Sequence, residues 1–337
     1  MSEIALTPKK VITKRKKKER LSVSQAALIW GRFRKYKTGV AGLIVMILLL
    51  LSVVIVPMLL PFDLTSPNPL QVYAPAGTVD NFNFAGATHW LGTDYLGRDV
   101  MTRLFIGGRV SLTVAIISSV MIVLIGSVLG AISGFYGGIV DTVMMRFTDF
   151  LLALPLLPLF LFALRLLKQS PGLTPYWRNA ETNTAITILA ISGVFTLFGW
   201  MGLARLVRGS ILSLRSQAFV EAARALGAAN NRIIFRHLLP NTLAPILVAA
   251  TFAVGDFIIL ESILAYFNQG INDPPLPSLG NMLSSSQALA LNITNLNPFQ
   301  DIRGYIFILP GIMVLITVLS INYIGDALRS ALDPHEV

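Results

Sequence analysis

The stretch VAGLIVMILLLLSVVIVPMLLP, residues 40–61, has no charged side chain. It is long enough to cross a membrane as one helix, which needs roughly 20 apolar residues. Five more largely apolar blocks of similar length follow, near residues 109–134, 141–166, 184–206, 242–265 and 305–326. The sequence therefore predicts an all-α membrane protein with six transmembrane helices.

The composition of the whole chain agrees with this class. Of 337 residues, 54% are hydrophobic and only 13% are charged, and the mean hydropathy is +0.69. Soluble domains carry about 25% charged residues. The absence of cysteine excludes a disulfide framework, thiol catalysis and a cysteine-ligated metal, and the three histidines lie far apart in the sequence. We expect neither a cofactor nor a metal site.

Basic residues are concentrated before the first span and in one loop. Residues 1–37 contain twelve Lys or Arg against two Glu. Such a run is typical of a nucleic-acid-binding arm, of a lipid-headgroup patch or of the cytoplasmic flank of a span. The loop at 207–241 has five Arg against one Glu, whereas the loops at 62–108 and 266–304 together have three Arg against six Asp. This bias favours the third interpretation. It predicts that both termini and the loop at 207–241 are cytoplasmic, with no nucleic-acid partner.

The spans divide the chain into five parts. We predict a basic cytoplasmic tail at 1–39, a first transmembrane helix at 40–61, an outer loop at 62–108, a transmembrane core at 109–326 and a cytoplasmic tail at 327–337. Within the outer loop, 91–105 places apolar residues on one helical side and Arg98, Asp99 and Arg103 on the other. This pattern predicts a helix that lies along the outer membrane surface.

Two local patterns predict how the spans are shaped. A stripe of glycines recurs every fourth residue at Gly126, Gly130, Gly134 and Gly138. Small residues in this spacing let two membrane helices approach closely, so we expect a tight helix contact there. Pro155 and Pro158 predict a bend in the third span, which neighbouring helices can accommodate.

The loop between the fourth and fifth spans contains helix start and stop signals. Ser216 is a candidate N-cap for a helix over 217–226, and Gly227 suits the left-handed residue that ends it. A second short helix over 228–239 would end at Pro240. The sequence therefore predicts a helix-turn-helix that projects into the cytoplasm.

This loop resembles the EAA motif of ABC importer permeases. Glu221-Ala222-Ala223 is followed by Gly227 and by Leu239-Pro240, and His237 stands where the broad family usually has Ile. Four more stretches resemble the peptide and nickel branch of the family, in the same order: HWLGTDYLGRDVMTRL (89–104), GFYGGIVDTVMMRFTDFLLALP (134–155), PSLGNML (277–283) and GDALRSALDP (325–334). The strongest resemblance is to the C-type permease subunit of oligopeptide and dipeptide importers.

The resemblance implies a non-catalytic subunit of a larger assembly. In this family the EAA helix fits a groove on a cytoplasmic ATPase. The residues that it would assign to this coupling are Glu221, Ala222, Ala223, Gly227, His237, Leu239 and Pro240. The implied partners are two ATPase subunits, a homologous second permease and an extracytoplasmic substrate-binding protein, in the inner (plasma) membrane of a bacterium or archaeon. Peptides are the expected substrate, with nickel chelates or oligosaccharides as alternatives.

Charged residues fall inside several predicted spans, where each costs about 2.5–3.5 kcal/mol at the bilayer centre. Among them are Arg146, Asp149, Asp256 and Glu261. Arg146 and Asp149 are three residues apart and can pair with each other. Asp256 and Glu261 are candidates for lining the translocation path, and Asp256 could instead pair with the second permease.

Two other classes of function are less well supported. The chain contains no G-x-x-x-x-G-K-[ST] phosphate loop, so ATP hydrolysis would require separate subunits. A secondary carrier often has inverted repeats, and no repeat relates the two halves. An intramembrane enzyme would need a nucleophile and base or a metal pair, and the predicted topology puts His89 and His237 in opposite compartments.

Overall fold

The computed structural model describes residues 25–64, 66–170, 184–271, 276–290 and 302–333. The basic run before residue 25 and residues 334–337 of the predicted C-terminal tail lie outside these ranges. Most of the described chain is helical.

Five helices are long and apolar enough to cross a membrane. They are α2 (Lys37–Leu59), α3 (Val100–Tyr136), α7 (Thr184–Leu214), α11 (Leu243–Tyr266) and α13 (Ile302–Leu332). A sixth crossing is possible if α4 (Gly138–Ala153) and α5 (Leu156–Gln169) form one span, although they meet at an angle of 89°. The predicted bend near Pro155 is confirmed. Leu154 has an extended backbone there, because the ring of Pro155 disfavours the helical conformation for the residue before it.

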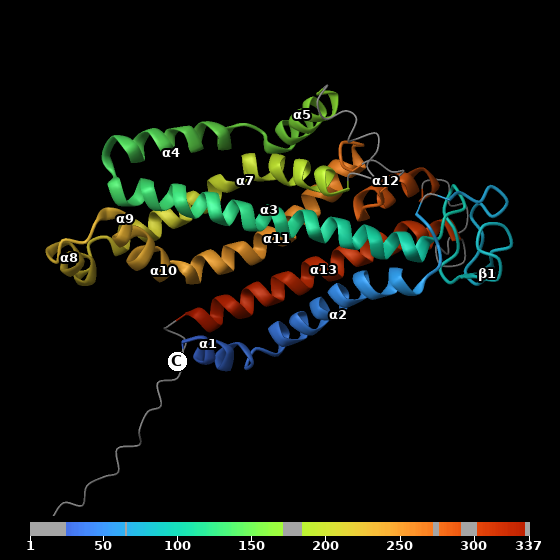
Figure 1. Ribbon diagram of the computed structural model, residues 1–337, viewed down its shortest axis with the longest axis horizontal. Helices are drawn as coiled ribbons and strands as arrows, with labels where there is room; N and C mark the ends of the chain where they lie inside the picture. The colour runs from blue at the N-terminus through green and yellow to red at the C-terminus, as the bar shows by residue number, and fades with distance from the viewer. Residues whose placement is uncertain (1–24, 65, 171–183, 272–275, 291–301, 334–337) are drawn as a thin grey trace, which may run out of the picture.

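The helix α3 is central in the bundle. It packs along α7 and also contacts α2, α11 and α12 (Leu279–Ala290), while α13 packs against α2, α11 and α12. The short α1 (Gln25–Phe33) packs on α13 through Phe33. In Figure 1, α1 and α8 (Ala218–Ala225) lie toward one end of the bundle, whereas the strand β1 (Thr78–Val79) and α12 lie toward the other.

The glycine stripe forms a close contact between α3 and α7. A Cβ atom on Gly130 would lie 2.4 Å from the carbonyl oxygen of Ala204, and one on Gly126 or Gly134 would lie 2.9 Å from a carbonyl oxygen of α7. The predicted tight contact is therefore confirmed for these three glycines. Gly138 is not part of it, because the chain turns at Gly137, where φ is +65°, and leaves open space around Gly138.

The segment between α2 and α3 folds into a small lobe, residues 62–64 and 66–99 of the described chain. Its strands β1 and β2 (Thr88–His89) pair antiparallel. The prediction of a surface helix over 91–105 is wrong, because α3 begins only at Val100 and the residues before it form turns. Asp99 caps α3 by accepting a hydrogen bond from the Thr102 backbone N–H at 2.7 Å.

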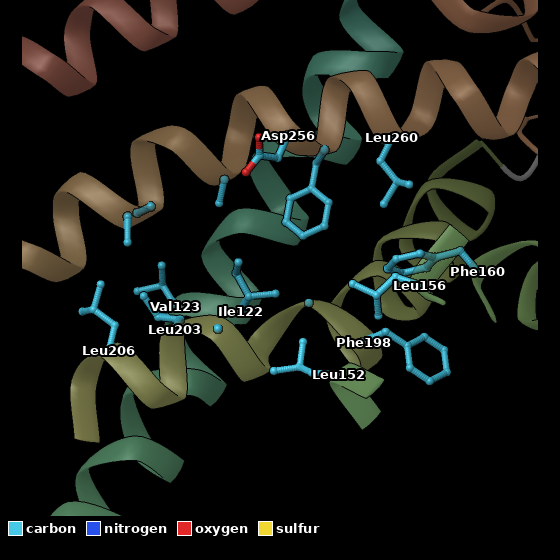
Figure 2. Close-up of a pocket in the computed structure, with 16 residues that line it drawn as sticks. Ile122, Val123, Leu152, Leu156, Phe160, Phe198, Leu203, Leu206, Asp256 and Leu260 are labelled. Atoms are coloured by element: carbon cyan, nitrogen blue, oxygen red, sulfur yellow. The ribbon is translucent and has the colours of Figure 1, made fainter. Parts of the chain in front are cut away.

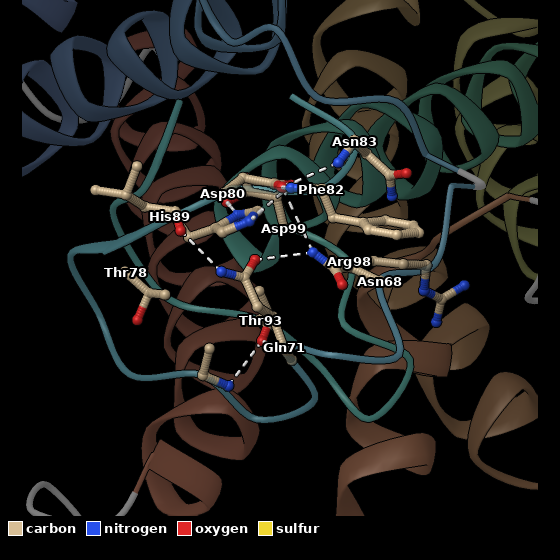
Figure 3. A network of polar contacts seen from close by, with 12 residues as sticks. Asn68, Gln71, Thr78, Asp80, Phe82, Asn83, His89, Thr93, Arg98 and Asp99 are labelled. Carbon is tan, nitrogen blue, oxygen red and sulfur yellow. Dashed lines mark hydrogen bonds and ion pairs between the residues drawn. The ribbon is translucent and has the colours of Figure 1, made fainter. Parts of the chain in front are cut away.

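Asp63 of this lobe is exposed, but its other charged side chains are buried, and Figure 3 shows the network that several of them form. His89 Nδ1 lies 2.9 Å from the Asp99 carboxylate, and His89 Nε2 lies 3.4 Å from the Asp80 carboxylate. Burial opposes the charge of Asp80, but the backbone N–H groups of Phe82 and Asn83 donate to it and hold its pKa below the ordinary value of 3.8.

Another carboxylate in the lobe binds two arginines. Asp94 accepts a hydrogen bond from Arg98 Nε at 2.9 Å, and its carboxylate lies 2.8 Å from Arg98 Nη2 and 3.2 Å from Arg103 Nε. Both arginines are only 2% exposed. Because Arg103 is on α3, this carboxylate ties the lobe to the first turn of the transmembrane helix.

Candidate functional site

A compact helical segment connects α7 to α11. It consists of α8, α9 (Asn230–Arg232), the π-helical turn η1 (Ile233–Leu238) and α10 (Leu239–Asn241), and we call residues 215–242 the coupling loop. Gly227 has φ +79° and ends α8 in the left-handed conformation, as predicted. The prediction for Ser216 is wrong. The N-cap of α8 is Gln217, and no side chain caps that end.

The second half of the coupling loop continues beyond the predicted end. It is helical from Asn230 to Asn241, so Pro240 lies inside it rather than ending it. Proline has no backbone N–H and its ring clashes with the carbonyl four residues earlier, which here belongs to Arg236. The π-helical turn η1 ends at Leu238, directly before the short α10 that contains this proline.

The helix α8 has one buried face. Val220 is fully buried in a cluster with Phe135 of α3 and Ile211 of α7, and Ala223 packs against the same cluster. The opposite face carries Phe219, Ala222 and Leu226, all exposed, with Leu226 at 88%. The two alanines of the motif therefore differ, since Ala223 faces inward and Ala222 faces outward.

The nearby arginines are engaged with the end of α3. The Arg224 guanidinium lies 5.4 Å from the centre of the Phe135 ring, and Arg215 Nη1 donates to the Gly134 carbonyl at 3.2 Å. Within the described residues, the exposed carboxylate of Glu221 has no ion-pair partner. The remaining motif residues, His237, Leu239 and Pro240, lie in η1 and α10 beneath α8 and are half-buried or exposed.

Two ion pairs join α4 to α7. Arg208 donates to Asp141 with Nη2 at 2.6 Å from the carboxylate, and Arg205 contacts Asp149. The predicted pairing of Asp149 with Arg146 is therefore wrong. A partner three residues away on the same helix is available, but the neighbouring helix supplies a closer one.

A cavity of about 370 Å³ opens between α3, the bend from α4 to α5, α7 and α11 (Figure 2). Its walls are apolar, and Asp256 is the only charged residue among those that line it. The lining residues are Ile122, Val123, Leu152, Leu156, Phe160, Phe198, Gly199, Gly202, Leu203, Leu206, Ala249, Ala250, Ala253, Asp256, Phe257 and Leu260.

Glu261 lies on α11 close to Asp256 in the sequence but in a different environment. It is 1% exposed and accepts a hydrogen bond from Ser111 Oγ of α3 at 2.8 Å. The same Ser111 oxygen accepts the Leu279 backbone N–H at 3.2 Å. Glu261 thus helps to join α3, α11 and α12, and it is not among the residues that line the cavity.

Comparison with known proteins gives this arrangement a family. Residues 126–336 match the family described as the binding-protein-dependent transport system inner membrane component. The chain belongs to this family. Residues 24–76 of the permease also match the N-terminal TM domain of oligopeptide transport permease C.

Curated relatives cover nearly the whole permease. It is 33% identical to the oligopeptide transport system permease protein of Bacillus subtilis over 94% of this chain and 91% of the relative. It is 33% identical to the dipeptide transport system permease protein of the same organism, over 94% and 88% of the two chains. The corresponding oligopeptide protein of Haemophilus influenzae is 34% identical, over 90% and 87%. The chain is therefore a multi-pass membrane permease.

Sequence reasoning did not predict which residues of the permease pair between the helices. Asp141 and Arg208 are 67 residues apart, and Ser111 and Glu261 are 150 apart. The signal available in the sequence was a charge inside an apolar span, which indicates that a partner exists but not which residue it is. The exposed Leu226 next to Gly227 was visible as an apolar residue at a helix end, and only the fold shows that it points outward.

Proposed function

We propose that this chain is a permease subunit of an ATP-driven, binding-protein-dependent importer of peptides. The observation that carries the proposal is the coupling loop, whose α8 is packed firmly on the transmembrane helices on one side and is uncovered on the other. The relatives named for oligopeptide and dipeptide transport support the substrate class.

The proposed topology has six crossings, with the bent pair α4–α5 counted as one. An even number of crossings returns α13 to the side where the chain begins, and the basic N-terminal run places that side in the cytoplasm. The tails at 1–39 and 327–337 would then be cytoplasmic, and the lobe within 62–108 would face outward. The position of α1 and α8 toward one end of the bundle supports this arrangement (Figure 1).

The outward face of α8 is the proposed contact with the ATPase. Phe219, Ala222 and Leu226 are three and four residues apart, so they form one stripe of a helix that would fit a groove. Glu221 adds a free carboxylate beside this stripe, which can pair with a basic residue of the ATPase. Gly227 would keep the turn tight enough for the stripe to be presented.

The buried face of α8 would transmit the movement. Val220, Ile233 and Leu238 pack with residues of α3 and α7, so a displacement of α8 would move these helix ends as one body. His237, Leu239 and Pro240 belong to the part of the loop that supports α8, which gives them a positioning role.

The proposed partners follow from these roles of the two faces of α8. ATP would be hydrolysed on two separate cytoplasmic subunits, a substrate-binding protein would deliver the peptide to the outer side, and a homologous second permease would complete the path. Asp256 would face that path from the cavity, whereas Glu261 would hold α3, α11 and α12 together beside it.

The coupling role is tested with the whole transporter in proteoliposomes. The variant Glu221→Lys should abolish ATP-dependent peptide uptake and lower co-purification of the ATPase, because it reverses a charge on the contact face. The control is Ser213→Lys, which adds the same charge at an exposed position of α7 outside α8. Full uptake by Glu221→Lys, or equal loss in both variants, would refute the docking role.

The location of the contact is tested by cross-linking. The chain has no cysteine, so Leu226→Cys introduces a single thiol on the exposed face. We expect a bifunctional thiol reagent to link this variant to the ATPase and not to link the buried control Val220→Cys. Cross-linking only from the Val220 position would contradict the proposed orientation of α8.

A further inference from the structure

The cavity between α3, the bend from α4 to α5, α7 and α11 contains a charged side chain that the coupling role does not explain. Asp256 is exposed and lines this cavity (Figure 2), and among the described residues nothing donates a hydrogen bond to it or forms an ion pair with it. Its neighbours on α11 that share the lining are Ala253, Phe257 and Leu260. The carboxylate is therefore a lone acid on an apolar surface.

Such a group is costly unless something binds to it. An ionised carboxylate in apolar surroundings loses much of its hydration, and an unpaired charge in a membrane protein usually marks the path of a substrate or an ion. A ligand cation would restore the lost interaction with charge-assisted hydrogen bonds. The carboxylate thus favours a positively charged ligand over a neutral or negative one.

Two glycines of α7 show that the open space is not a by-product of helix packing. A Cβ on Gly199 would lie 2.9 Å from the Phe257 ring, so helix packing itself requires glycine there. A Cβ on Gly202 would meet nothing within 4 Å, although Gly202 lines the same cavity. The absence of a side chain at Gly202 keeps the cavity open without serving a helix contact.

The size of the cavity limits what it can hold. At about 370 Å³ it is within the range of roughly 300–1,000 Å³ that is usual for small-ligand sites. It can enclose one end of a peptide but not an extended chain. The apolar walls suit a side chain, and the single acid suits a basic group beside it.

We propose that this cavity binds the ammonium group of a peptide during its passage, with Asp256 as the counter-charge. This inference rests on the proposed function for the identity of the substrate, but the cation preference of the site can be measured without transport. The ammonium can come from the peptide N-terminus or from a lysine side chain, and the experiment below separates the two sources.

The cation preference is measured by thiol modification in the assembled transporter. Gly202→Cys introduces a thiol into the cavity of a chain that has none. We expect a cationic methanethiosulfonate to react with it faster than an anionic one. Adding Asp256→Asn should lower the ratio of the two rates roughly tenfold, the effect of losing one charged hydrogen bond.

A matched control uses another glycine of α7. Gly209 is exposed, a Cβ there would also meet open space, and it does not line the cavity. The ratio of rates at Gly209→Cys should not change with Asp256→Asn. A ratio at Gly202→Cys that is unaffected by Asp256→Asn would overturn the proposal.

Transport then identifies the source of the ammonium. We compare uptake of three peptides: Ala-Gln-Ala with a free N-terminus, N-acetyl-Ala-Lys-Ala, and N-acetyl-Ala-Gln-Ala, which has no ammonium group. For each peptide, uptake by the Asp256→Asn variant is divided by uptake by the unmodified transporter, so that selection by the binding protein cancels. A roughly tenfold loss of uptake of the first peptide indicates that the site binds the N-terminal ammonium. The same loss for the second peptide indicates that it binds the lysine side chain. Equal losses for all three overturn the proposal.

The remaining outcomes are also decisive. If the unmodified transporter takes up no peptide but the thiol ratios behave as expected, the peptide function fails and the cation site stands. If Asp256→Asn instead prevents co-purification of the second permease, Asp256 pairs with that subunit and the proposal is overturned.

Discussion

The lobe that connects α2 to α3 and the coupling loop that connects α7 to α11 are held in opposite ways. Apart from the exposed Asp63, the charges of the lobe are buried, and Asp94 and Asp99 bind the side chains that surround them. The coupling loop encloses apolar residues such as Val220 and leaves Glu221 and Leu226 uncovered. The lobe is therefore stabilised by its own polar contacts, whereas the loop has a face that only another protein would cover.

The largest expected effect is in the lobe. Asp94→Ala would leave Arg98 and Arg103 buried beside an empty site, and breaking a buried ion pair in this way costs about 3–5 kcal/mol. We expect the lobe to unfold at a clearly lower temperature, measured in detergent from the fluorescence of Trp90. The control is Asp63→Ala at an exposed acid of the same lobe, which should unfold at the temperature of the unmodified protein. Equal shifts in both variants would show that the buried network does not hold the lobe.

A smaller effect separates the two faces of α8. Val220→Ala removes fully buried methyl groups and should destabilise the coupling loop by about 2 kcal/mol. Leu226→Ala removes exposed ones, so thermal unfolding should not change, while affinity for the ATPase should fall about 30-fold if Leu226 is a central contact. Both are measured on the purified permease, by thermal unfolding and by titration with the ATPase. The reverse assignment of the two effects would contradict the division of faces.

The turn at Gly227 should show a modest effect that depends only on the backbone. Gly227→Ala forces a side chain into φ +79° and should cost about 1 kcal/mol, although a Cβ there meets nothing within 4 Å. Gly227→Asn should cost less, because asparagine tolerates the left-handed conformation. The rate at which a protease cleaves the coupling loop is compared between the unmodified protein, Gly227→Ala and Gly227→Asn. If alanine and asparagine had equal effects, the cost would come from steric crowding by the added side chain and not from the left-handed backbone conformation.

The smallest effect is a pH dependence confined to the lobe. The pKa of Asp80 is lower in the folded lobe than its ordinary value of 3.8, so its contribution to stability is present above that value and is lost as the pH falls through the folded pKa. The unfolding temperature of the lobe should therefore fall with acidification below about pH 4. Asp80→Asn should flatten this part of the profile. Identical profiles for the two proteins would exclude Asp80 as the cause.

Some features could be predicted because they are local in the sequence. The glycine stripe indicated a close helix contact, and the structure adds that α7 is the partner and that Gly138 is excluded by the turn at Gly137. The bend at Pro155 and the left-handed Gly227 follow from backbone chemistry that acts within a few residues.

Other features could not be predicted, and the reason is the same in each case. The pattern of 91–105 separates apolar from charged residues as a surface helix would. In the structure Asp99 pairs with His89 and Arg103 pairs with Asp94. The spacing of apolar and charged residues along the chain does not reveal these contacts. Asp149 had a partner within reach on its own helix and contacts Arg205 instead.

The sequence by itself determined the class of the protein, because hydropathy, charge bias and turn residues act over short stretches and need no knowledge of the neighbours. Only the tertiary structure decided which charges meet, which face of α8 is open and that Asp256 lines a cavity while Glu261 is buried. These depend on contacts between residues far apart in the chain, where burial and pairing are set by the helices that pack alongside.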